Sequence, residues 1–135
     1  MRRHNAATYW RSLESSQIYN GHDFEQFIAQ KLRDHGMHAT VTPGSGDQGV
    51  DILATTRKGT RIAIQTKLYS KPVTNKAVQE VLAGMVFYKY SMAVVVTNQG
   101  FTDSAQQLAA STGVKLIGFD QLKDIEDGTH WIYHY

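Results

Sequence analysis

The stretch that decides the fold is residues 49–67, which read GVDILATTRKGTRIAIQTK. Residues 50–56 and 61–69 are rich in aliphatic and β-branched side chains, and each segment predicts a β-strand. The connection between them is short, polar and contains Gly59. A connection of this kind favours an antiparallel hairpin, so the centre of the chain is predicted to be a pair of adjacent strands.

The segments on either side of this hairpin supply helices and further strands. Apolar residues recur there at helical spacing, whereas residues 93–97 form the continuous apolar run that is typical of a strand buried on both faces. The sequence therefore predicts an α/β fold, a mixed sheet flanked by helices in the order α-β-β-β-α-β-α-β-α. The predicted elements are a helix at 22–35, strands at 37–41, 50–56 and 61–69, a helix at 75–88, a strand at 93–97, a helix between Thr102 and Gly113, a strand at 114–119 and a short helix capped by Asp120.

Length and composition limit the class of protein. The chain has 135 residues, of which 41% are hydrophobic, which is the length of one domain with enough apolar surface for a core. We expect that domain at residues 21–125, with an N-terminal extension at 1–20 and a C-terminal tail at 126–135. No apolar stretch approaches the roughly 20 residues of a membrane span, so no membrane partner is expected.

Cysteine content and net charge add two further limits. The chain has no cysteine, which excludes a disulfide framework, a cysteine-based zinc site and thiol catalysis. Because the start of the sequence also lacks the pattern of a secretory signal, we expect a cytoplasmic protein. Fourteen basic and twelve acidic residues give a net charge of +2, which is too small to decide for or against a nucleic-acid partner.

Three polar residues of the hairpin form a candidate catalytic set. Side chains alternate along a strand, so Gln65 and Lys67 are expected on one face, about 7 Å apart, with Asp51 brought opposite them by the hairpin. Magnesium prefers oxygen ligands, which the Asp51 carboxylate, the Gln65 carbonyl and the Thr66 backbone carbonyl could supply. Lys67 could then orient a water, stabilise negative charge or act as a base. This chemistry suits metal-assisted hydrolysis of a phosphodiester.

Each residue also has an ordinary structural explanation. Asp51 could simply begin a strand after a glycine-rich loop, and Lys67 could be a solvated charge at the edge of a sheet. However, an apolar strand containing Ile62 and Ile64 does not require Gln65 and Lys67 on one face. The spacing of the set therefore favours a functional site over three unrelated residues.

The same residues carry a resemblance to a known family. Residues 44–51, GSGDQGVD, followed by residues 64–67, IQTK, resemble the catalytic core of Mrr-type restriction endonucleases, a branch of the PD-(D/E)XK nuclease superfamily. The resemblance extends from about residue 21 to residue 125, which is most of the chain. Further matching stretches lie at residues 24–25, 75–80, 94–98 and 100–102.

The resemblance implies a restriction-endonuclease-like sheet and an Mg²⁺-dependent endodeoxyribonuclease, with Mn²⁺ as a substitute metal. By similarity, Asp51 is the metal-binding aspartate and Lys67 the catalytic lysine. Gln65 stands where the wider superfamily has an acid and the Mrr branch has glutamine. Glu25 matches the superfamily's helical acid, which binds metal through water. On its own, an acid in the first turn of a helix needs no catalytic explanation, because it favours the helix dipole.

A run of basic residues gives DNA as the expected partner. Six bases and no acid lie between residues 57 and 76, and such a local excess can contact backbone phosphates. Lys71 and Lys76 are the stronger candidates, whereas the bases of the hairpin could equally well only solvate its tip. Tyr69 could contact DNA or pack against its neighbours. The expected DNA contacts are Lys71, Lys76, Arg57, Lys58, Arg61, Tyr69 and, in the glycine-rich loop, Ser45.

Two departures from the family pattern leave alternatives open. Position 68 is leucine where the Mrr branch often has a base, and the chain has no room for the DNA-recognition domain that such enzymes commonly carry. We therefore expect a separate recognition protein or domain, and a homodimer because a duplex has two strands to cut. The alternatives are a non-catalytic DNA-binding or assembly module on the same fold and a structure-specific repair or junction nuclease.

Overall fold

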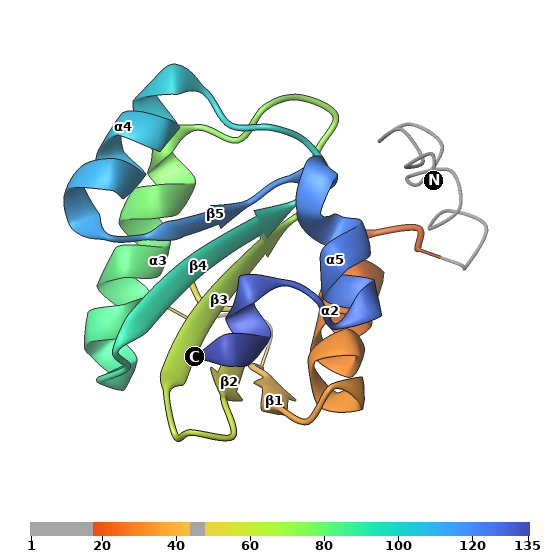
Figure 1. Ribbon diagram of the computed structural model, residues 1–135. Coiled ribbons are helices and arrows are strands. Elements are labelled where there is room, and N and C mark those ends of the chain that lie inside the picture. The colour runs from red at the N-terminus through yellow and green to blue at the C-terminus, as the bar shows by residue number, and fades with distance from the viewer. Residues whose placement is uncertain (1–17, 44–47) are drawn as a thin grey trace.

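The computed structural model describes residues 18–43 and 48–135, and its five strands form one mixed sheet in the order β1-β2-β3-β4-β5 (Figure 1). Most of the predicted extension and the predicted DNA contact at Ser45 lie outside the described residues. The strands are β1 (His38–Val41), β2 (Ile52–Thr55), β3 (Arg61–Lys67), β4 (Met92–Thr97) and β5 (Lys115–Ile117); the helices are α2 (Gly21–Asp34), α3 (Asn75–Tyr88), α4 (Asp103–Thr112) and α5 (Leu122–Asp127), with 3₁₀ turns η1 (Phe119–Gln121) and η2 (Trp131–His134).

The direction of each strand follows from the connection before it. The tight turn at residues 56–60 returns the chain antiparallel to β2, with Ile52 paired to Ile64. The next two connections pass through α3 and α4, and these crossovers place β4 and β5 parallel to β3. The predicted fold class is confirmed.

The sheet is covered on both faces, which separates the interior into two cores. In Figure 1, α2 and α5 lie on one face of the sheet, and α3 and α4 lie on the other. Strand β4 contributes to both cores because its side chains alternate: Val94 and Val96 pack with α2 and α5, whereas Ala93 and Val95 pack with α3 and α4. This explains why residues 93–97 are continuously apolar.

The C-terminal part departs from the predicted details. Asp120 does not cap the last helix, because it lies inside η1, and α5 begins only at Leu122. The predicted C-terminal tail contains η2, whose Ile132 is buried in the core between the sheet, α2 and α5. Isolated aromatic residues near a chain end carry no periodicity, so their docking could not be read from the pattern.

Burial of His130 makes stability depend on pH. The side chain is 4% exposed and its Nδ1 accepts a hydrogen bond from the Ile132 backbone, while burial lowers the pKa of His130 and Asp124 opposes this shift more weakly. The folded protein therefore binds fewer protons than the unfolded chain below about pH 6.5. Stability should be complete above that pH and should decrease as the pH falls toward the lowered pKa.

We predict that His130→Asn reduces this acid sensitivity. Asparagine keeps an acceptor for the Ile132 N–H but does not titrate. Between pH 7 and pH 5 the melting temperature of the wild type should fall more than that of the variant, by on the order of a few degrees. Circular dichroism melts of both proteins measure the difference, and parallel losses in the two proteins would contradict this assignment.

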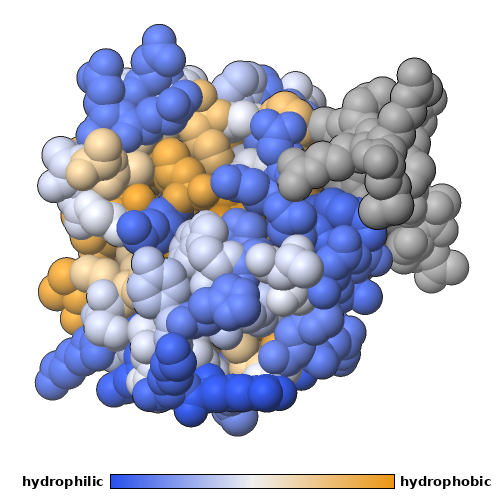
Figure 2. Space-filling model, in the orientation of Figure 1, coloured by the Kyte–Doolittle hydropathy of each residue, from blue (hydrophilic) through white to orange (hydrophobic). Residues whose placement is uncertain are grey.

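The surface in Figure 2 is largely hydrophilic, with apolar side chains gathered over the side where α3 and α4 lie. Two large apolar side chains on α3 are exposed, Val86 at 68% and Phe87 at 59%. Within residues 18–43 and 48–135, none of the helices has the length and apolar character needed to cross a membrane.

Candidate active site

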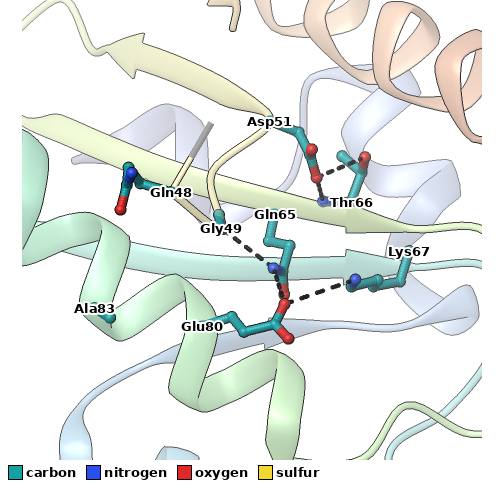
Figure 3. A pocket seen from close by; sticks show the side chains of 8 residues that line it. All are labelled: Gln48, Gly49, Asp51, Gln65, Thr66, Lys67, Glu80 and Ala83. Atoms are coloured by element: carbon teal, nitrogen blue, oxygen red, sulfur yellow. Dashed lines mark hydrogen bonds and ion pairs between the residues drawn. The ribbon is translucent and has the colours of Figure 1, made fainter. Parts of the chain in front are cut away.

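A cleft of about 430 Å³ opens where β3 ends, between the start of β2 and helix α3 (Figure 3). A smaller hollow of about 90 Å³, lined among others by Tyr69 and Lys76, shares Lys67 and Glu80 with it. The two hollows therefore adjoin each other at the end of β3. The residues that line the larger cleft are Gln48, Gly49, Asp51, Gln65, Thr66, Lys67, Glu80 and Ala83.

Asp51 lies immediately before β2, and its backbone N–H donates to the Ile64 carbonyl of β3 at 2.8 Å. Thr42 holds this point in place, because its backbone N–H donates to the Asp51 carbonyl at 2.9 Å and its hydroxyl donates to the Val50 carbonyl at 2.7 Å. The Asp51 carboxylate accepts from the Thr66 backbone N–H at 2.8 Å. A side chain thus takes the place of a backbone acceptor, and the carboxylate is fixed at the rim of the cleft.

Gln65 is buried, with 3% of its surface exposed. Its Nε2 donates to the Gly49 carbonyl and to Glu80 Oε2, both at 3.1 Å. Its Oε1 is buried and has no hydrogen-bond partner among the described residues. Such an acceptor is costly to leave unsatisfied, since the desolvation of a buried polar group amounts to roughly 1–3 kcal/mol.

Lys67 lies two residues further along the same face of β3. Its Nζ is 3.9 Å from Glu80 Oε2, and its side chain is 24% exposed. The other oxygen of Glu80 is 3.9 Å from the Nζ of Lys76, whose side chain is 81% exposed. The cleft thus combines a buried amide, a partly exposed ammonium and a carboxylate that links them to the outer surface.

Two glycines allow α3 to approach the strand so closely. A Cβ at Gly49 would lie 2.6 Å from the Glu80 backbone oxygen, and Gly49 has a φ of +77°. A Cβ at Gly84 would collide with the Gln48 backbone oxygen and the Val50 side chain. The helix therefore rests directly on the backbone of residues 48–50, and this contact places Glu80 beside Gln65.

The donor set fits a divalent cation. Asp51 provides a carboxylate and Gln65 provides a neutral oxygen without a partner, and both line the same cleft. Mg²⁺ takes few protein ligands and keeps several waters, so two or three oxygens in an open cleft suffice. A cluster of three or more His, Cys, Asp or Glu side chains that could hold a metal is absent from the described part of the chain.

The structure places other predicted residues around this cleft or away from it. Glu25, on α2, is 3.2 Å from His22 Nδ1 and is not among the residues that line the cleft. Tyr69 is 42% exposed beside Lys67, whose Nζ lies 5.7 Å from the centre of its ring. Asn98 holds the Tyr69 backbone through two hydrogen bonds of 2.8 Å. Lys71 is exposed on the connection from β3 to α3.

The bases of the hairpin do not surround the cleft. Arg61 begins β3 and Lys67 ends it, so the five strand residues between them place them about 20 Å apart. Arg61 lies over the Tyr90 ring at 4.3 Å, Lys58 donates to the His134 carbonyl at 3.3 Å, and Arg57 packs against Gly36. The basic residues between 57 and 76 therefore form two separate groups, one at each end of β3, and their contact with DNA stays a prediction.

Sequence reasoning gave no role to Glu80. In the sequence, Glu80 lies four residues after Lys76 on a predicted helix, and this spacing is typical of an ordinary exposed ion pair. Only the contact between α3 and residues 48–50 turns Glu80 toward Gln65 and Lys67.

Comparisons with known proteins agree with this architecture. A family model described as restriction endonuclease, the Mrr catalytic domain, matches residues 17–125. No curated protein matches the chain.

Among solved structures, the chain is similar to a protein of unknown function, AF1548, with a TM-score of 0.61 and 22% identity over 78% of this chain and 61% of the other. It is also similar to the MspJI restriction endonuclease in complex with a 27-mer oligonucleotide, with a TM-score of 0.60 and 20% identity over 89% of this chain and 30% of the other. A repair endonuclease from Pyrococcus abyssi has a TM-score of 0.53 and 15% identity over 76% of this chain and 48% of the other. The chain thus spans between about a third and three fifths of these proteins.

Proposed function

Since this chain belongs to the Mrr-type restriction endonuclease family, we propose that it is a metal-dependent DNA endonuclease that hydrolyses phosphodiester bonds. The observation that carries the proposal is the partnerless, buried Oε1 of Gln65, a residue that lines the same cleft as Asp51 and Lys67. Mg²⁺ is the proposed ion, with Mn²⁺ as a substitute, because both accept hard oxygen ligands.

Asp51 and Gln65 would hold the ion, with the Thr66 backbone carbonyl as a further candidate. When bound, a divalent ion polarises the scissile phosphate and acidifies a bound water. Asp51 is fixed for this role by the Thr66 N–H, so its carboxylate does not have to reorganise. The carboxylate and the amide together place one negative charge against the ion, and the phosphate of the substrate would supply another.

Lys67 would act on the same phosphate from the side of the cleft that faces α3. Its ammonium is paired with Glu80 and lies on the same face of the strand as Gln65. We propose that it donates hydrogen bonds to the phosphate or the attacking water and stabilises negative charge in the transition state. Glu25 stays a candidate for binding the metal ion through a water molecule.

DNA as the substrate is supported by the family and by the surface beside the cleft. Tyr69, Lys71 and Lys76 are exposed next to the site and could contact successive phosphates of one strand. Arg57, Lys58 and Arg61 would require DNA to extend about 20 Å to the other end of β3. The homodimer stays a prediction that rests on the two strands of a duplex, and the separate recognition partner stays a prediction as well.

The test is cleavage of supercoiled plasmid with Mg²⁺, with Mn²⁺ and with EDTA, using the wild type, Asp51→Ala and Lys67→Ala. We expect cutting only by the wild type and only with a divalent ion. Equal cutting by all three proteins would end the assignment. Salt-dependent DNA binding that ignores EDTA, without any nicking, would instead identify a non-catalytic module. Branched and single-stranded substrates in the same assay distinguish a structure-specific nuclease.

A further inference from the structure

We propose that Glu80 is a positioning residue that fixes the side-chain amide of Gln65 with its oxygen, rather than its nitrogen, directed to the metal. This inference rests on the proposed function. A carboxylate presents two equivalent oxygens, so either can bind a cation. An amide has one acceptor end and one donor end, and only the acceptor end can bind the ion. Glutamine at position 65 therefore creates a requirement for orientation that an acid would not have.

The contacts around Gln65 meet this requirement. Its Nε2 lies 3.1 Å from the Gly49 carbonyl and 3.1 Å from Glu80 Oε2, and both of these groups can only accept hydrogen bonds. Rotating the amide by half a turn would place Oε1 against two oxygens and lose both bonds. Because Gln65 is buried, with 3% of its surface exposed, water could not replace them. One amide orientation is therefore strongly favoured.

Glu80 is the stronger of the two acceptors. Its hydrogen bond involves an ionised group, and such bonds are about twice as strong as neutral ones. The same oxygen lies 3.9 Å from the Nζ of Lys67, so one carboxylate oxygen orients both the amide and the ammonium (Figure 3). The close contact of α3 with Gly49 holds the helix, and thus Glu80, at a fixed distance from the strand.

The test measures metal binding without DNA. Isothermal titration calorimetry with Mn²⁺ and Mg²⁺ compares the wild type with Glu80→Met and Glu80→Gln. The methionine removes the acceptor at similar size, whereas the glutamine keeps an acceptor oxygen and loses the charge. We expect Glu80→Met to weaken metal binding by roughly 10- to 100-fold, as for other residues that orient metal ligands. Glu80→Gln, whose neutral oxygen makes a weaker hydrogen bond to the amide, should bind the metal less tightly than the wild type but more tightly than Glu80→Met. Gln79→Met, on the exposed neighbouring position of α3, is the matched control and should bind like the wild type.

A second measurement reports the amide itself. In the metal-free wild type, both Nε2 protons of Gln65 should exchange slowly with solvent, as followed by NMR and assigned with Gln65→Met. In Glu80→Met one of these protons should exchange faster. Metal binding as tight in Glu80→Met as in the wild type would overturn the proposal. A loss of metal affinity in Glu80→Gln as large as that in Glu80→Met would also overturn it, because Glu80 would then act through its charge. If the wild type binds no divalent ion, the proposed function fails, and the exchange rates still show whether Glu80 holds the amide.

Discussion

Asp51→Asn is expected to lower plasmid cleavage by about 1,000-fold, because the loss of a metal-bound charge costs several kcal/mol of transition-state stabilisation. Asparagine has nearly the same shape, and its carbonyl oxygen can still accept from the Thr66 N–H that Asp51 binds at 2.8 Å. The fold should therefore be preserved while the charge is lost. Rates of nicking at saturating DNA measure the loss of cleavage, and Mg²⁺ titration by calorimetry measures the loss of metal binding.

A matched control separates the site from the charge of the whole protein. Asp103→Asn removes the same charge from an exposed position in the first turn of α4, and it should cut DNA like the wild type. If Asp51→Asn retained cleavage within a few-fold of the wild type, Asp51 would not be a metal ligand. A loss of cleavage with unchanged metal affinity would exclude that role as well.

Lys67→Met is expected to lower cleavage by roughly 100- to 10,000-fold, the range that a positioned proton donor or acceptor contributes. Methionine resembles the lysine stem in length and removes only the ammonium. Metal binding should be retained or strengthened, because a positive charge is removed from the neighbourhood of the ion. The combination of lost cleavage and retained metal binding distinguishes Lys67 from Asp51, for which both should be lost.

The control for this variant is Lys115→Met, at an exposed position of β5. It changes the net charge equally and should leave cleavage unaffected. Should Lys67→Met cut at the wild-type rate, the lysine would belong to the surface of the protein rather than to its chemistry.

Much of the architecture could be predicted from local patterns, because both strand alternation and helix periodicity are local properties. The two central strands, the crossover helices and the buried strand β4 were all predictable in this way. Gln65 and Lys67 could be assigned to one face because they lie two residues apart on one strand. The expected position of Asp51 opposite these two residues depends on the register of the hairpin, which the short turn nearly determines.

What could not be predicted depends on contacts between distant segments. Glu80 reaches Gln65 because α3 touches the backbone at Gly49, and two glycines thirty-five residues apart carry no sign in the sequence that both belong to this contact. The separation of the basic residues has a simpler cause. They are close in the sequence, but an extended strand carries Arg61 far from Lys67.

The direct contact of α3 with residues 48–50 has a consequence for protein engineering. A designer who grafted Asp51, Gln65 and Lys67 onto the hairpin of another scaffold would transfer the reacting groups but leave behind the acceptors that orient the amide. The minimal transplantable unit is therefore the hairpin together with its crossover helix, including the two glycines that let them touch.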